Sequence, residues 1–80
     1  MSWDLDGDKM YRKFTFDNFD LAWDFMNEVA QVAKKQNHHP EWKNVYNQVE
    51  IWLSTHDAND SITFKDLELA NEIDLIFEKP

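Results

Sequence analysis

The sequence predicts an α+β fold in which a four-stranded antiparallel sheet carries two helices on one face, in the order ββαββα. Two segments, residues 17–36 and 63–77, repeat apolar side chains three and four positions apart, as one face of a helix does. Four short segments have strand character, and the clearest of them alternates apolar and polar residues over 49–53. The connections between these segments are short, which favours two packed layers around one core.

The first two strands are expected at residues 3–5 and 9–16, with a turn at residues 6–8 between them. The only glycine of the chain, Gly7, lies in this turn, where a residue without a Cβ is most often needed. Three apolar residues share one face of the second strand: Met10, Phe14 and Phe16. Arg12 interrupts that face, and we interpret it as a charge at a sheet edge that reaches solvent or discourages edge pairing.

The first helix is expected to run from Asp17 to Gln36. Asp17 is a suitable N-cap, and Lys34 and Lys35 in the last turn suit the negative end of the helix dipole. The apolar stripe that should face the core contains Ala22, Phe25, Met26, Val29, Ala30 and Ala33. Three further apolar residues widen this surface near the start of the helix: Phe19, Leu21 and Trp23. They are expected to add core contacts or to form an oligomer face.

The next two strands are expected to form a hairpin that reverses at Asn47, because asparagine tolerates the left-handed conformation that short turns require. Folding the segment about Asn47 places His38 or His39 opposite His56, where cross-strand Cβ atoms lie about 5 Å apart. Pro40 should hold His39 in extended backbone. All three histidines of the chain are therefore expected at the open end of one hairpin.

The last helix has a clear start signal. Thr63 is the expected N-cap, and Asp66 occupies the third helical position in an acidic variant of the capping box. Ile62 and Leu67 occupy the two positions of a hydrophobic staple. The buried stripe is expected to contain Leu69, Ala70, Ile73, Ile76 and Phe77. We interpret Asp66 as a helix cap.

The composition restricts the classes of function. Sixteen acidic and eight basic residues give a formal charge of −8, which disfavours binding to nucleic acid or to anionic membrane surfaces. The absence of cysteine excludes thiolate chemistry, and a single glycine is too few for a phosphate-binding loop. No long apolar run or signal-peptide pattern is found. We therefore expect one cytoplasmic domain.

The three histidines indicate proton transfer, because an unperturbed imidazole titrates at about pH 6.5. Asp57 lies next to His56 and should favour its charged form, which makes His56 the better acid. Two alternatives remain open: a nucleophile at Ser54 or Thr55 beside a histidine, and a metal ion bound by three histidines. We favour one imidazole as general acid and another as general base, without a metal or a cofactor.

Several motifs match one known family in both residue identity and spacing. They are Phe14-x-Phe16-x-Asn18-Phe19, Lys34-xxx-His38-His39-Pro40-Glu41-Trp42, Asn44-Val45-Tyr46-Asn47, Leu53-Ser54-Thr55-His56 and Asp66. Across these motifs, from about Trp3 to Ile76, the chain resembles the pterin-4a-carbinolamine dehydratases.

This resemblance implies a single dehydratase-like domain over residues 1–80 that lacks the N-terminal helix of longer relatives. It implies dehydration of the 4a-hydroxytetrahydropterin made by aromatic amino-acid hydroxylases, which yields quinonoid dihydropterin. It also implies that His38 and His56 exchange protons with the pterin and that His39 binds and orients it. The residues implied to line the pterin pocket beside the histidines are Asn37, Ser54, Thr55 and Asp57. The alternative is a non-catalytic interaction module with the same fold.

The sheet face away from the helices carries a large aromatic residue. In the second hairpin strand Val49, Ile51 and Leu53 should face the helices, so Trp52 should face the side that two helices cannot cover. An indole in that position favours self-association. The resemblance also implies a dimer or a tetramer, so we expect a homo-oligomer.

Overall fold

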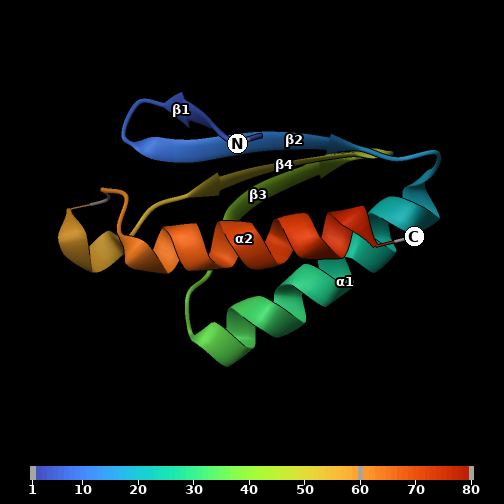
Figure 1. The fold of residues 1–80 in the computed structure, drawn as a ribbon. Coiled ribbons are helices and arrows are strands. Elements are labelled where there is room, and N and C mark those ends of the chain that lie inside the picture. The colour runs from blue at the N-terminus through green and yellow to red at the C-terminus, as the bar shows by residue number, and fades with distance from the viewer. Residues whose placement is uncertain (1, 60, 80) are drawn as a thin grey trace.

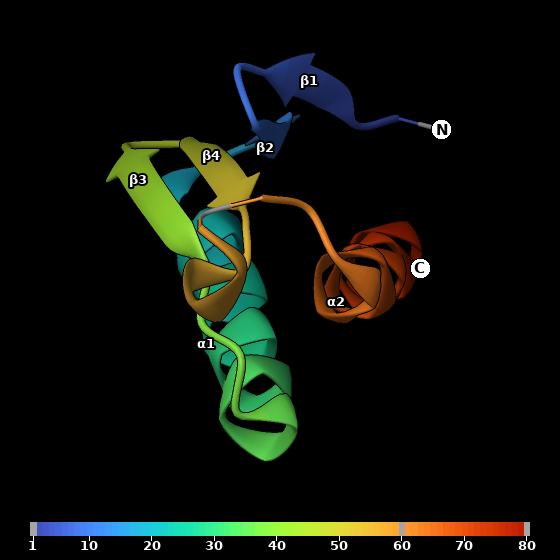
Figure 2. The ribbon, with the colours of Figure 1, turned by 90° about the vertical axis from the view of Figure 1, so that its left-hand side faces the viewer.

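The computed structural model describes residues 2–59 and 61–79 and has the predicted ββαββα order. The elements are β1 (Asp4–Asp6), β2 (Lys9–Thr15), α1 (Phe19–Gln36), β3 (Glu41–Val45), β4 (Gln48–Leu53), a short 3-10 helix η1 (His56–Ala58) and α2 (Phe64–Glu78). The strands form one antiparallel sheet in the order β1-β2-β4-β3. Both helices lie on the same side of this sheet (Figure 1 and Figure 2).

The hydrophobic core fills the space between the sheet and the two helices. The buried residues that form it are Trp3, Met10, Phe14, Ala22, Phe25, Val29, Val49, Ile51, Leu53, Leu69, Ala70 and Ile73. They include the three apolar residues of the alternating strand β4, so the predicted inward face of that strand is confirmed. Phe14 lies among other rings, with its centroid 4.8 Å from Phe25 and 5.0 Å from Phe77. Aromatic packing is therefore a large part of this small core.

The sequence suggested that Arg12 lies at a sheet edge, but this prediction is wrong. β1 pairs with the outer side of β2 and makes β2 an internal strand. The guanidinium instead reaches α2, where Nη1 lies 2.6 Å from Asp74 Oδ1. It also lies over the Phe14 and Phe77 rings, at 4.5 Å and 5.1 Å from their centroids. Arg12 thus links the sheet to the helix layer through an ion pair and cation–π contacts.

Helix α1 begins two residues later than predicted. The N-cap is Asn18, whose side-chain oxygen accepts the Leu21 N–H at 2.9 Å, and not the neighbouring Asp17. The apolar residues at the start of this helix do not join the core, since Phe19 is 42% exposed and Trp23 is 50% exposed. Within residues 2–59 and 61–79, neither helix has the length and apolar character needed to cross a membrane.

The hairpin turn differs from the prediction. It consists of Tyr46 and Asn47, and Tyr46 has the left-handed φ of 52° that was expected of Asn47. Asn47 is fixed to the end of β2 instead, because its side-chain amide donates to the Phe16 carbonyl at 2.8 Å. The Phe16 N–H in turn donates to the Asn47 carbonyl at 2.9 Å. The predicted register, which placed His38 or His39 opposite His56, is therefore wrong. β3 starts at Glu41, after the paired histidines.

Trp52 lies on the sheet face away from the helices, as predicted, but its own chain covers part of it. Its ring centroid is 5.2 Å from that of Tyr11, and its Nε1 donates to Asp6 Oδ2 at 2.8 Å. Tyr11 in turn donates its O–H to Glu50 Oε1 at 2.7 Å. This hydrogen bond, together with burial and the charge of Glu50, raises the pKa of Tyr11 to about 12.

This shift predicts a pH-dependent loss of stability. The Tyr11–Glu50 interaction stabilises the folded state fully below about pH 10, where tyrosine in the unfolded chain is neutral. The contribution is lost as pH rises from 10 to about 12. In a tyrosinate absorbance titration we expect an ionisation near 12 that is absent from Tyr11→Phe and moves towards 10 in Glu50→Gln. A Glu50→Gln protein with an unchanged titration would contradict the role of Glu50.

Candidate active site

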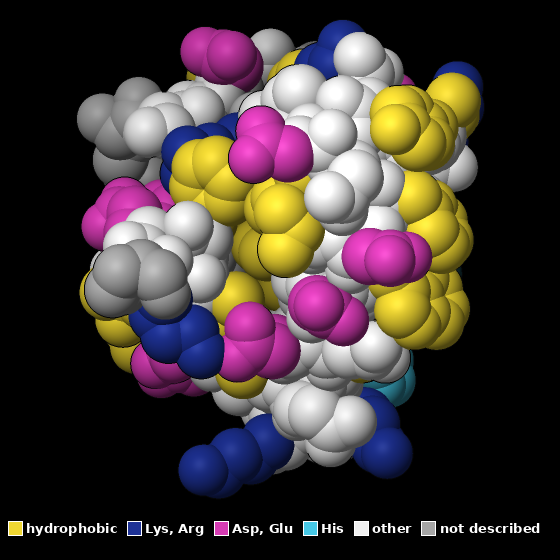
Figure 3. Space-filling view, turned by 90° about the vertical axis from the view of Figure 1, so that its right-hand side faces the viewer, with side chains coloured by type: hydrophobic (Ala, Val, Ile, Leu, Met, Phe, Trp, Pro, Cys, Tyr) yellow, Lys and Arg dark blue, Asp and Glu magenta, His cyan; other side chains and the backbone are white. Residues whose placement is uncertain are grey.

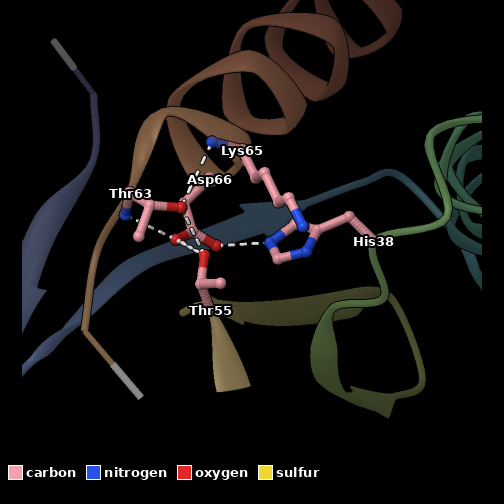
Figure 4. A network of polar contacts seen from close by, with 5 residues as sticks. All are labelled: His38, Thr55, Thr63, Lys65 and Asp66. Carbon is pink, nitrogen blue, oxygen red and sulfur yellow. Dashed lines mark hydrogen bonds and ion pairs between the residues drawn. The ribbon is translucent and has the colours of Figure 1, made fainter. Parts of the chain in front are cut away.

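The first wall of the site forms where α1 ends. Asn37 has left-handed backbone angles, with φ 52° and ψ 42°, and its N–H donates to the Lys34 carbonyl at 3.2 Å. The next N–H, that of His38, donates to the Ala33 carbonyl at 3.1 Å. Asparagine adopts this conformation more readily than most residues that carry a Cβ, so it suits the end of a helix. This turn stops α1 and places His38 in the following segment, facing the start of α2 (Figure 4).

The second wall is the N-terminus of α2. The Thr63 side chain accepts the Lys65 N–H at 3.3 Å, and the Thr63 N–H donates to Asp66 Oδ2 at 2.9 Å. The predicted capping box is therefore confirmed. These reciprocal bonds hold Asp66 in a fixed position in the first turn of the helix.

The third wall is the segment that follows β4. The Thr55 N–H donates to the Ser61 carbonyl at 2.9 Å, and the Thr55 carbonyl accepts the Ala58 N–H at 3.0 Å. These bonds close a compact loop around η1, which starts at His56. Thr55 and His56 are thereby held close to the start of α2.

A network of polar contacts joins the three walls. His38 Nε2 lies 2.6 Å from Asp66 Oδ1, and the Thr55 hydroxyl donates to Asp66 Oδ2 at 2.7 Å. The hydroxyl oxygens of Thr55 and Thr63 are 2.5 Å apart. Asp66 is completely buried, and the His38 side chain is 11% exposed. The helix-cap interpretation of Asp66 is therefore correct but incomplete, since the same carboxylate binds His38 (Figure 4).

These walls border an open cavity of about 340 Å³. The residues that line it are Asn37, His38, His39, Ser54, Thr55, His56, Asp57 and Lys65. The structure thus brings all seven of the predicted site residues together around one cavity. His39 and His56 are exposed there, whereas His38 is largely buried.

Lys65 was not predicted as part of the site. Its side chain extends from the first turn of α2 towards His38 and contributes a cation to the cavity lining (Figure 4). One signal in the sequence could have drawn attention to it. The first turn of a helix favours acidic residues, so a lysine directly before Asp66 is unusual for a purely structural position.

Two observations concern the alternative chemistries. Within residues 2–59 and 61–79, no group of three or more histidine, aspartate or glutamate side chains is arranged to hold a metal ion. The Thr55 hydroxyl directs its proton to Asp66, so it is not activated by a histidine. What the cavity offers is three imidazoles, hydroxyl and amide groups, a carboxylate and an ammonium. Its volume lies in the range of small-molecule sites, and imidazoles can transfer protons there at neutral pH.

Comparisons with known proteins agree on one family. Residues 1–76 match the family model described as pterin 4 alpha carbinolamine dehydratase. A protein of Bradyrhizobium sp. strain BTAi1, provisionally named a pterin-4-alpha-carbinolamine dehydratase, is 53% identical over 74 residues, which are 91% of this chain and 74% of that protein. A protein of Prochlorococcus marinus strain MIT 9312 with the same provisional name is 44% identical over 77 residues, covering 96% of this chain and 79% of its own length.

Two solved structures share the fold. A transcriptional coactivator/pterin dehydratase from Brucella melitensis superimposes with a TM-score of 0.89 at 37% sequence identity, over 95% of this chain and 82% of its own. A pterin dehydratase-like protein, described as a RuBisCO assembly factor in the alpha-carboxysome, has a TM-score of 0.83 at 17% identity, over 100% of this chain and 94% of its own. At that identity, the second structure is evidence for the fold alone.

Proposed function

Because the chain belongs to the pterin 4 alpha carbinolamine dehydratase family, we propose that it dehydrates a 4a-hydroxytetrahydropterin to quinonoid dihydropterin and water. The observation that carries this proposal is the convergence of His38, His39 and His56 on one small polar cavity. This reaction returns a pterin cofactor to its recycling route after a hydroxylase has used it.

The chemistry needs one acid and one base and no oxidant. The acid protonates the hydroxyl on C4a, the C–O bond breaks, and water leaves. The base removes the proton of the neighbouring amine, and the electron pair of the broken N–H bond forms the new C=N bond. In our proposal His38 and His56 carry out these proton transfers, and His39 binds and orients the pterin.

The remaining cavity residues have polar groups suited to a flat heterocycle. The side chains of Asn37, Ser54 and Asp57 line the same cavity, and Lys65 adds a cation. We propose that they bind the polar edge of the pterin ring, whereas Thr55 acts on the cavity indirectly through its bond to Asp66. The substrate is a neutral ring system, so the net charge of −8 does not oppose its binding.

A direct assay tests this proposal. We expect the purified protein to accelerate the decay of synthetic 4a-hydroxytetrahydropterin above the uncatalysed rate, followed by the absorbance of the quinonoid product. Boiled protein and buffer serve as controls for spontaneous dehydration. A decay rate equal to that of buffer would reject the enzymatic function and favour the competing one, an interaction module that keeps the fold without the reaction.

We also propose that the chain forms a homo-oligomer, either a dimer or a tetramer. Its surface bears an exposed aromatic pair, here named the α1 flank, that consists of Phe19 and Trp23, four residues apart on one face of α1. The Phe19 and Trp23 rings are stacked with centroids 6.3 Å apart. On another side of α1, the exposed Leu21 lines a mainly apolar hollow of about 410 Å³ between α1 and α2. Figure 3 shows hydrophobic side chains exposed on this end of the molecule. Exposed apolar patches of this kind are typical of protein interfaces.

Substitutions on α1 and on the sheet face away from the helices should separate the candidate interfaces. We expect light scattering of the wild-type protein to give a multiple of 9.6 kDa, and Trp23→Glu to shift the mass towards that of one chain. Trp52→Glu is the matched control, because Trp52 is already held by Asp6 and Tyr11 of its own chain. A wild-type mass near 9.6 kDa at micromolar concentration would refute self-association.

A further inference from the structure

The surroundings of Asp66 determine which of its oxygens can meet which donors. Asp66 Oδ2 accepts the Thr63 N–H at 2.9 Å and the Thr55 hydroxyl at 2.7 Å, while Oδ1 lies 2.6 Å from His38 Nε2. A backbone N–H can only donate, so Oδ2 must be an acceptor. Asp66 is completely buried, and buried polar atoms satisfy their hydrogen bonds within the protein.

The hydroxyl groups around Asp66 fix the direction of every proton in the network. Thr55 has one hydroxyl proton and gives it to Asp66 Oδ2. The Thr63 hydroxyl, 2.5 Å away, must therefore donate to Thr55, and it accepts the Lys65 N–H in turn. All these donors lead to Asp66 Oδ2, and hydrogen bonds accepted by a carboxylate favour its ionised form. An ionised carboxylate can only accept hydrogen bonds, so the proton in the short contact with His38 resides on Nε2.

We infer that Asp66 is a positioning residue that holds His38 in the tautomer with its proton on Nε2, which leaves the unprotonated Nδ1 for the substrate. Figure 4 shows one ring nitrogen of His38 directed at the carboxylate and the other directed away from it. This inference rests on the proposed function and deepens it. It makes His38 the base that takes the amine proton and leaves protonation of the departing hydroxyl to His56.

Every proton in this arrangement has a donor and an acceptor. The amine proton moves to Nδ1 of His38, which becomes an imidazolium with a proton on each nitrogen. The carboxylate of Asp66 stabilises that charge through the Nε2–H bond, and it keeps its own hydrogen bonds to Thr63 and Thr55 throughout. The proton on Nδ1 later passes to solvent, and His56 regains the one that it gave to the leaving water.

The substitution Asp66→Asn tests the inference because the protein dictates how the new amide is oriented. The Thr63 N–H and the Thr55 hydroxyl both require an acceptor, so the amide oxygen takes the place of Oδ2. The amide NH₂ then faces His38 Nε2, which must become an acceptor. The proton of His38 moves to Nδ1, and the base is lost although the cavity keeps its shape. Loss of a general base predicts a kcat lower by about 10²–10⁴-fold, with little change in KM.

The tautomer is read directly from the ¹⁵N chemical shifts of the histidine ring nitrogens in long-range NMR spectra. In the wild type we expect a protonated Nε2 and an unprotonated Nδ1 in His38, and the reverse in Asp66→Asn. The matched control is Asp74→Asn, the same chemical change on the same helix at a carboxylate that binds Arg12 and Trp3. It should leave both the His38 shifts and kcat unchanged.

The wild-type spectrum alone keeps the inference testable if Asp66→Asn does not fold. A wild-type His38 with its proton on Nδ1 overturns it, as does a folded Asp66→Asn protein with the wild-type kcat. If the wild type shows no dehydratase activity, the proposed function fails. The ring-nitrogen shifts still decide in that case whether Asp66 sets the tautomer of His38.

Discussion

Replacing His56 with alanine is expected to slow dehydration of the 4a-hydroxytetrahydropterin by about 10²–10⁴-fold, the usual contribution of a positioned acid or base. His56 is exposed at the start of η1, so its loss should leave the fold intact. The comparison of kcat for wild type and His56→Ala, with circular dichroism to verify folding, measures this effect.

The companion variant His38→Ala should show the same loss of rate together with a loss of stability. Removing His38 takes one hydrogen-bond partner from the buried Asp66 carboxylate, which costs about 1–3 kcal/mol. Thr15→Ala, at an exposed position on β2, is a control that should change neither quantity. Wild-type rates in both histidine variants would refute acid–base catalysis by these residues.

Replacing Phe14 with alanine is expected to lower the free energy of unfolding by about 3–5 kcal/mol. Phe14 is 1% exposed and contacts the rings of Phe25 and Phe77, and the Arg12 guanidinium lies 4.5 Å from its centroid. Domains of this kind have total stabilities of about 5–15 kcal/mol, so the variant should be close to unfolding at 25 °C. Urea denaturation of both proteins gives the difference.

The matched control for this substitution is Phe64→Ala. Phe64 is 73% exposed at the first position of α2, so the same chemical change should alter stability by less than about 0.5 kcal/mol. Equal effects at the two positions would mean that the rings around Phe14 do not stabilise the fold.

Local signals in the sequence were sufficient for most of the fold. The alternation in β4 predicted which of its residues are buried, because side chains of a strand point to opposite faces regardless of the rest of the chain. The capping box at Thr63 and Asp66 was likewise predicted, since its partners are three residues apart. The N-cap of α1 was misplaced by one residue because Asp17 and Asn18 are both good caps and only the geometry of the chain entering the helix separates them.

The wrong expectations concern contacts between distant residues. The edge assignment of Arg12 failed because strand order is not encoded locally, and Asp74 lies 62 positions further along. The hairpin turn was misassigned because Asn47 is bound to Phe16, 31 positions away. The contact between Asp66 and His38 was missed for the same reason, because nothing near Asp66 in the sequence indicates that α2 starts beside the end of α1.

The central strand pair also has a consequence for how the protein folds. β2 pairs with β4, so Met10 lies opposite Leu53. Because α1 and β3 lie between these strands in the sequence, the contact closes a long loop that contains both elements. Contacts between distant segments close large loops and form slowly, whereas helices and hairpins form quickly. His38 lies within this loop, whereas Asp66 follows β4, so the two residues meet only after the loop has closed. During refolding, helix content should therefore appear first, and enzymatic turnover should return only with the slowest kinetic phase.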